Sequence, residues 1–178
     1  DPEGSMIVDI GGGTTEIAVT ALGGIVVNRS IRVAGDEMDE AIIAYLRLRH
    51  GILIGQPTAE MLKIAIGNAY PDKNEEEKFS VVRGRDLETG LPRSLKISST
   101  DVREALSPVI NQIITAISQL IEETPPELVS DILNRGIALA GGGSLLRNVD
   151  VAISEATKMP VWVADDPLTA VVRGTGKV

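Results

Sequence analysis

The stretch Met6-Ile-Val-Asp-Ile-Gly-Gly-Gly-Thr-Thr-Glu16 decides how the rest of the chain is interpreted. Its apolar start predicts a buried strand, and the three glycines predict a sharp turn into a second strand. Glycines let backbone N–H groups approach a ligand closely, and the threonines add hydroxyl groups. Such a turn suits a phosphate, with Asp9 beside it to hold a magnesium ion or its water shell. An ordinary glycine-rich hairpin turn, with Asp9 bonded to its own backbone, explains this stretch alone equally well.

Composition narrows the classes of protein that fit. The 178 residues suit one domain, or one domain with a substantial insertion, and 43% hydrophobic residues suffice for a core. A net charge of −8 and an aromatic content of 2% argue against nucleic-acid binding, which needs basic clusters or stacking aromatics. The absence of cysteine and the single histidine, His50, exclude disulfides, thiolate metal sites and multi-histidine metal sites. No apolar run has the length of a membrane-spanning helix, and the acidic start is unlike a signal peptide.

The sequence after the glycine turn predicts an antiparallel meander and then two helices. Residues 15–22 and 25–33 are expected to be strands, joined by a two-residue turn at Gly23-Gly24. Asp36 is the expected N-cap of a helix over residues 37–50. His50 and Gly51 close this helix in the ordinary way, and His50 has no other expected role. A second helix is expected over residues 58–69, after Pro57.

The next elements form a hairpin and a long helix. Residues 79–85 and 93–98 are predicted strands, preceded by an exposed acidic loop over residues 71–78. A strong three-and-four periodicity predicts a long helix from Val102 to Ile121, with Ser99, Thr100 and Asp101 as cap candidates. Pro108 should bend that helix or mark its true start.

The last part of the chain repeats the pattern of strand and glycine triplet. A short helix over residues 127–134 and a strand over residues 136–140 precede Gly141-Gly-Gly-Ser144, which is expected to open an amphipathic helix. Residues 161–163 are a predicted strand with Trp162 in the core, and Asp165-Asp166-Pro167 is expected to cap a final helix.

The two glycine triplets are best explained together. Each follows a buried strand, and ligands of open α/β sheets bind beyond the carboxyl ends of strands. A helix N-terminus after the second triplet would favour an anion or the polar edge of a nucleotide. Glu60 and Lys63 are three residues apart on the second helix and share a face. They form either a solvated ion pair or two polar arms that reach a ligand such as a ribose.

These motifs resemble the actin-like ATPase superfamily. Asp9-Ile-Gly-Gly-Gly-Thr-Thr-Glu16 is similar to its second phosphate motif, and Gly141-Gly-Gly-Ser144 is similar to its adenosine motif. Thr58-Ala-Glu-Met-Leu-Lys63 resembles its Glu-x-x-Lys helix at the ribose and adenine. Val33-Ala-Gly-Asp-Glu-Met-Asp39 and Asp166-Pro-Leu-Thr-Ala-Val-Val-Arg-Gly-Thr-Gly176 resemble one branch, that of the rod-shape protein MreB and its paralogue Mbl. The resemblance runs nearly end to end.

The resemblance implies an α/β fold: an actin-like, ribonuclease-H-like ATPase domain with an inserted α+β subdomain. The main subdomain would comprise residues 1–36 and 99–178, and residues 37–98 would be the inserted outer subdomain. ATP or ADP with Mg²⁺ would be the cofactors. Asp9 would act indirectly through the magnesium or water, and no other catalytic residue is implied. The nucleotide would be bound by Gly11, Gly12, Gly13, Thr14, Glu60, Lys63, Gly141, Gly142, Gly143 and Ser144.

The resemblance also implies a function for a longer protein. It would be a cytoplasmic, membrane-associated cytoskeletal ATPase, slow in turnover, that polymerises with itself and determines rod shape by organising cell-wall synthesis with morphogenesis proteins. The first phosphate motif and its domain are absent from this sequence. We therefore expect a C-terminal half that by itself binds ATP weakly and hydrolyses it negligibly. The alternatives are a fragment of another superfamily ATPase, either a chaperone or a sugar kinase, and an interaction module without a ligand.

Overall fold

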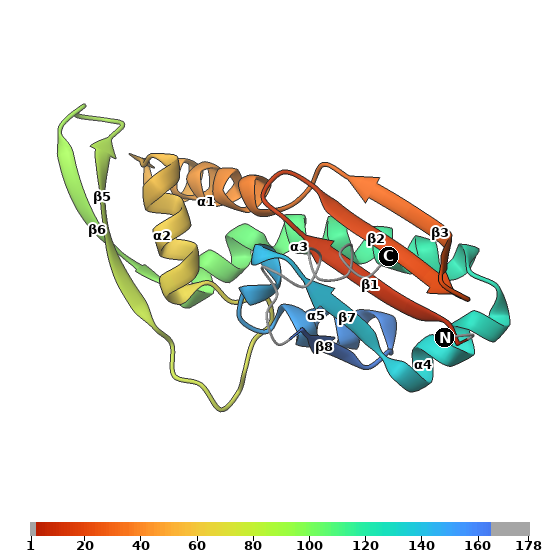
Figure 1. The fold of residues 1–178 in the computed structure, drawn as a ribbon. Coiled ribbons are helices and arrows are strands. Elements are labelled where there is room, and N and C mark those ends of the chain that lie inside the picture. The colour runs from red at the N-terminus through yellow and green to blue at the C-terminus, as the bar shows by residue number, and fades with distance from the viewer. Residues whose placement is uncertain (1–2, 165–178) are drawn as a thin grey trace.

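A five-stranded sheet carries both glycine triplets in the computed structural model, which describes residues 3–164 (Figure 1). The strands lie in the order β3-β2-β1-β7-β8. Antiparallel pairing joins β1 (Ser5–Ile10), β2 (Thr15–Ala21) and β3 (Gly24–Ile31), which confirms the predicted meander. Parallel pairing joins β1 to β7 (Ile137–Ala140) and β7 to β8 (Val161–Val163). Because β1 and β7 are parallel, the two triplets that follow them lie at the same edge of the sheet.

A second, three-stranded sheet protrudes from one end of the molecule (Figure 1). It consists of β4 (Ile52–Leu53), β5 (Phe79–Asp86) and β6 (Pro92–Ser98). The β5–β6 hairpin follows the prediction, whereas β4 was not predicted, since two residues are too few for an alternating pattern. All its strands lie within residues 37–98, and the strands of the larger sheet lie outside that range. The buried hydrophobic residues form one continuous cluster that includes both sheets, and the proposed subdomain boundaries stay a prediction.

Five α-helices and one short 3₁₀ helix surround the sheets over the described residues. They are α1 (Gly35–His50), α2 (Gln56–Ile66), α3 (Ser99–Glu123), α4 (Pro126–Arg135), the 3₁₀ helix η1 (Gly142–Leu145) and α5 (Val149–Thr157). The long α3 packs on β2 and β3 of the larger sheet and also on α1 and α2 (Figure 1). Because it also packs on β6, α3 contacts both sheets.

The central strand β1 shows why this sheet is buried. Met6, Val8 and Ile10 are fully buried, and the alternating positions Ile7 and Asp9 are exposed or half-buried. In a strand, successive side chains point to opposite faces, so one face of β1 supplies the core and the other remains accessible to polar groups. Asp9 thus reaches the carboxyl end of β1 without entering the core.

The β2–β3 turn differs by one residue from the expected Gly23-Gly24. Ala21 pairs with Gly24, so Leu22 and Gly23 form the two-residue loop, both with positive φ (55° and 78°). A loop of this kind requires positive φ at both central positions to match the twist of the strands. Leucine rarely adopts positive φ, but Leu22 does so here. Its side chain is exposed.

Helix ends also differ from the expected ones. Ala34, not Asp36, is the N-cap of α1, and the Glu37 carboxylate accepts a hydrogen bond from the Ala34 N–H at 3.0 Å. Ser98 is the N-cap of α3 and forms a capping box with Asp101. Helix α2 begins and ends earlier than predicted, at Gln56 and Ile66. Such shifts arise because composition marks a cap region better than the single residue with the required φ and ψ.

Two further expectations concern single residues. Pro108 lies inside α3, which continues through it, so it does not mark the start of that helix. Trp162 is 51% exposed rather than in the core, because β8 is the edge strand of the sheet that the described residues form. The expected final helix after Asp165 lies outside the described residues.

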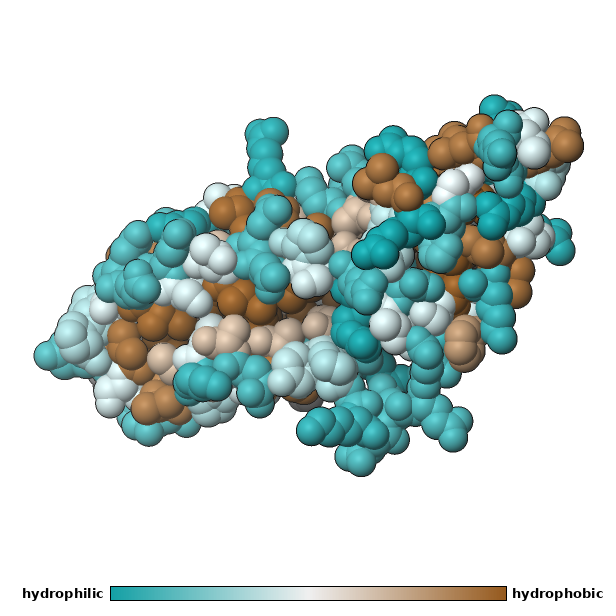
Figure 2. Space-filling model, turned by 180° about the vertical axis from the view of Figure 1, so that it is seen from behind, coloured by the Kyte–Doolittle hydropathy of each residue, from teal (hydrophilic) through white to brown (hydrophobic). Residues whose placement is uncertain are grey.

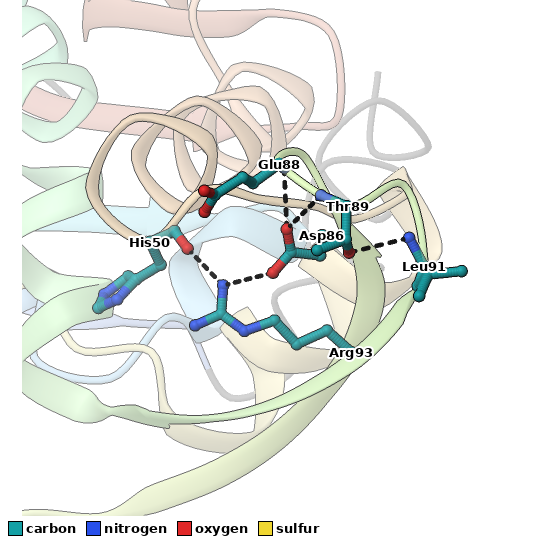
Figure 3. A network of polar contacts seen from close by, with 6 residues as sticks. All are labelled: His50, Asp86, Glu88, Thr89, Leu91 and Arg93. Carbon is teal, nitrogen blue, oxygen red and sulfur yellow. Dashed lines mark hydrogen bonds and ion pairs between the residues drawn. The ribbon is translucent and has the colours of Figure 1, made fainter.

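The tip of the β5–β6 hairpin is fastened to the end of α1 (Figure 3). Arg93 Nη1 lies between the His50 carbonyl oxygen (2.8 Å) and the Asp86 carboxylate (3.4 Å). The other Asp86 oxygen accepts hydrogen bonds from the Glu88 and Thr89 N–H groups (2.8 and 3.0 Å). These backbone hydrogen bonds, more than the nearby Arg93 charge, lower the pKa of Asp86. The hairpin therefore projects from the molecule in a defined orientation.

The rear face shows hydrophobic side chains interrupted by polar ones, including along the projecting hairpin (Figure 2). Exposed hydrophobic residues of that hairpin include Phe79, Val81, Leu87 and Leu91. Among the described residues, no helix is both long and apolar enough to cross a membrane.

Candidate functional site

The first glycine triplet forms a turn that rests on the start of α1. The Gly11 N–H donates to the Thr14 carbonyl at 2.9 Å, which closes the turn. The Gly11 and Gly12 carbonyls accept hydrogen bonds from the Gly35 and Asp36 N–H groups at 3.0 and 2.7 Å. Within residues 3–164, nothing accepts from the N–H groups of residues 12–14, which are exposed. The turn thus presents backbone donors outward, as an anion-binding loop does.

Asp9 lies at the end of β1, between the two triplets. It is directly opposite Glu16 of β2 and pairs with Ala140 of β7. Partial burial and the Glu16 charge both raise the pKa of Asp9. A cation would relieve this repulsion, and Mg²⁺ is commonly held by one or two carboxylates together with phosphate oxygens and water. The described residues contain no cluster of three or more metal-binding side chains, and the indirect magnesium contact of Asp9 stays a prediction.

The second triplet is packed against the end of β1. Gly141 has φ 83° and ψ 165°, and a Cβ atom there would lie 2.3 Å from Asp9 Oδ1 and 2.4 Å from the Ile10 carbonyl oxygen. A Cβ atom on Gly143 would lie 2.3 Å from Ile10 Cγ2. At Gly141 both the backbone conformation and the filled space exclude a side chain, whereas at Gly143 the filled space alone excludes one.

The segment after Gly141 corrects one expectation. The triplet opens the 3₁₀ helix η1, and the α-helix starts only at Val149, with Asn148 as its N-cap at φ 61°. Ser144 is buried, and its Oγ donates to the Gly141 carbonyl at 2.6 Å. Ser144 therefore stabilises its own turn, and no α-helix N-terminus stands at the triplet.

The two triplets and α2 line one cleft of about 960 Å³. Its walls include Gly11, Gly12, Glu60, Lys63, Gly142 and Gly143. The other predicted residues are not among its lining: Asp9, Gly13, Thr14, Gly141 and Ser144. The volume is that of a site for a drug-sized or nucleotide-sized ligand. The structure thus brings together residues from three distant segments, and the ligand-binding roles of individual residues stay predictions.

Lys63 is not paired with Glu60. Its ammonium nitrogen lies 2.8 Å from Asp39 Oδ1 on α1 and donates to the Gly35 carbonyl at 3.2 Å. Asp39 is 3% exposed, and Glu60 is exposed toward the cleft. The solvated pair that we considered for Glu60 and Lys63 is therefore wrong. Asp39 was not singled out from the sequence, although it closes the Val33–Asp39 motif, because its partner is on another helix.

The outer wall of the cleft comes from the acidic loop between α2 and β5. Glu75 of this loop pairs with Arg147, which follows η1. The Asn148 side chain donates to Asn68 Oδ1 at 3.1 Å and to the Tyr70 carbonyl at 3.2 Å. These contacts join the segment after α2 to the segment after the second triplet. Sequence patterns missed all of them, since the partners are separated by about half of the chain.

Comparison with known proteins identifies the family. The model of the MreB/Mbl protein family matches residues 1–178. The chain belongs to the MreB/Mbl family. This membership agrees with the resemblance seen in the motifs and separates the chain from the chaperones and sugar kinases that were the alternative.

Relatives within the MreB/Mbl family cover nearly all of this chain. The cell shape-determining protein MreB of Pasteurella multocida (strain Pm70) is 50% identical over 174 residues, which are 98% of this chain and 50% of the relative. The cell shape-determining protein Mbl of Bacillus subtilis (strain 168) is 46% identical over 175 residues, 98% of this chain and 52% of the relative. The chain thus spans about half the length of the curated relatives it matches.

Solved structures of MreB/Mbl relatives show the same fold. The crystal structure of MreB5 of Spiroplasma citri bound to ADP superimposes with a TM-score of 0.93 at 43% identity, over 98% of this chain and 53% of MreB5. MreB5 has also been solved bound to AMPPNP. A MamK double helical filament gives a TM-score of 0.77 at 24% identity over 98% of this chain and 55% of its own, a likeness of fold alone. The fold is therefore actin-like, as the sequence predicted.

Proposed function

We propose that this chain is the second half of an ATP-binding, filament-forming cytoskeletal protein that determines rod cell shape by organising cell-wall synthesis. One observation carries the nucleotide part of the proposal. Gly11 and Gly12 of the first turn line one cleft together with Glu60 and Lys63 of α2 and with Gly142 and Gly143 of the second triplet. The MreB5 structures bound to ADP and AMPPNP support the same ligand class.

We propose a part in binding for each segment of the cleft. The N–H groups of residues 12–14 would donate to the β- and γ-phosphates, and Glu60 and Lys63 would contact the nucleoside. The backbone of residues 141–143 would lie along the adenosine. Asp9 would hold Mg²⁺ through water, and the ion would neutralise phosphate charge when bound. Ser144 would support this wall by closing its turn on Gly141.

The relatives support the proposed polymerisation. Two curated relatives carry the name cell shape-determining protein, and MamK forms a double helical filament. We propose that the full-length protein polymerises with itself in the cytoplasm and acts at the membrane together with cell-wall morphogenesis proteins. Nucleotide in this fold is clamped between two domains, so slow hydrolysis would require the other half, and this chain alone would be nearly inactive.

The substitution Gly12→Val in the full-length protein tests the nucleotide site. A Cβ atom on Gly12 would find only Asp36 Oδ1, at 3.8 Å, so the variant should fold while its side chain occupies the space above the turn. We expect loss of calorimetric ATP–Mg²⁺ binding and of ATP-dependent pelleting. Gly24→Val is the matched control, since its Cβ atom meets nothing within 4 Å and it lies in the remote hairpin. Wild-type affinity in Gly12→Val would refute the assignment.

A further inference from the structure

The buried pair of Asp39 and Lys63 is unusual because it lies in the wall of the cleft. The side chains are 4% and 16% exposed, and the two charged atoms are 2.8 Å apart. Asp39 Oδ1 has no aligned hydrogen-bond donor within the described part of the chain, so the contact is an ion pair. A buried ion pair is seldom more stabilising than apolar residues of the same volume. Stability alone therefore gives a weak reason for charges at this position.

A short path of contacts connects this pair to the glycine turn. Lys63 Nζ donates to the Gly35 carbonyl, and the Gly35 N–H donates to the Gly11 carbonyl at 3.0 Å. The added Cβ atom of a residue at position 35 would lie 3.3 Å from the Gly11 oxygen and 3.7 Å from Lys63 Nζ. The lysine, the start of α1 and the turn thus converge at Gly35, where a larger side chain would separate them.

The ammonium group retains capacity to bind a ligand. It carries three N–H donors. Gly35 takes one and the Asp39 carboxylate faces the group, while Lys63 itself lines the cleft. A lysine side chain that moves freely loses rotamer freedom when it binds, whereas one already held in place does not. Asp39 holds the ammonium in one position before any ligand arrives.

We propose that Asp39 is a positioning residue for nucleotide binding: its buried carboxylate holds Lys63 at the cleft so that the ammonium contacts the ribose. This inference rests on the proposed function, because it assumes that the cleft binds a nucleotide. Asp39 also lines the cleft, and its proposed part is to position Lys63. It also explains why a carboxylate is buried on the α1 face that packs against α2.

The test compares the full-length wild type with Asp39→Asn, Lys63→Met and the double variant. Calorimetry measures affinity for ATP–Mg²⁺ and for 2′,3′-dideoxy-ATP–Mg²⁺. Each variant should bind ATP about tenfold more weakly, the scale of the rotamer freedom of one lysine. The double variant should be no weaker than the singles, since both remove one interaction. Affinity for the dideoxy analogue, which lacks the ribose hydroxyls, should change little.

A matched control is Glu123→Gln, which breaks the remote Arg29–Glu123 pair (2.6 Å) and should leave both affinities unchanged. Wild-type ATP affinity in Asp39→Asn, effects that multiply in the double variant, or equal weakening of both nucleotides would each overturn the inference. The last result would mean a general structural role. Failure of the proposed function is distinct: it appears as no ATP binding by the wild type, or as full binding by Gly12→Val.

Discussion

The substitution Gly141→Ala should destabilise the fold more than Gly23→Ala or Gly13→Ala. Gly141 occupies φ 83°, ψ 165°, a region that costs another residue about 1–3 kcal/mol. The added Cβ atom would also lie 2.3 Å from Asp9 Oδ1 and 2.4 Å from the Ile10 oxygen. Both neighbours belong to β1, the central strand, so relief of the overlap requires strand movement that costs a further 1–3 kcal/mol or so.

The free energy of unfolding should therefore fall by about 2–6 kcal/mol, a large part of the stability of an ordinary domain. Urea denaturation of the full-length protein, followed by far-ultraviolet circular dichroism, measures this change. Two variants separate the cost of the backbone conformation from the cost of the filled space. Gly23→Ala has positive φ (78°) but open space, so it should lose only about 1–2 kcal/mol. Gly13→Ala has open space and no positive φ and should be nearly neutral.

Equal losses in Gly141→Ala and Gly23→Ala would refute the reasoning. They would mean that β1 and η1 move apart at little cost and that the close approach of the second triplet to Asp9 is not enforced by packing. In that case glycine at position 141 would be required by backbone conformation alone.

Two further predictions concern α3. Burial would raise the pKa of Asp101, but hydrogen bonds from Ser98 and the charge of His50 outweigh it and hold the pKa low. The ionised Asp101 carboxylate therefore stabilises the folded state above its unfolded pKa, and this stabilisation is lost as pH falls through the folded pKa. Asp101→Asn should lower the free energy of unfolding by about 1 kcal/mol at pH 7 and by progressively less below about pH 4. Urea titrations at several pH values measure the difference. A constant difference from pH 7 to pH 3 would contradict this. Pro108 is exposed inside α3, where proline is up to about 3 kcal/mol less favourable than alanine. Pro108→Ala should raise the melting temperature of the full-length protein, and a decrease would show that the proline is needed where it stands.

Local patterns were sufficient for the elements and for the place where the site forms. The apolar run of β1 and the strong periodicity of α3 predicted both elements, because a strand or helix that packs in the core needs apolar side chains on its buried face. The rule that ligands bind beyond the carboxyl ends of strands predicted that the two triplets would meet, and the parallel pairing of β1 with β7 brings them together. Single residues at turns and caps were less well predicted, as the Leu22-Gly23 loop shows.

The sequence by itself thus determined most of the strands and helices, the two glycine turns and the family resemblance, but not the short strand β4 or the 3₁₀ helix η1. Only the tertiary structure decided which distant residues lie against one another: Lys63 with Asp39 rather than Glu60, Glu75 with Arg147, and the backbone of Gly141 with Asp9. It also decided that Trp162, on the edge strand of the described sheet, is half exposed. The physical reason is that periodicity reports that a face is buried, but not which distant element covers it. Gly11 and Gly12 line a cleft only because α1, α2 and the second triplet are packed around them.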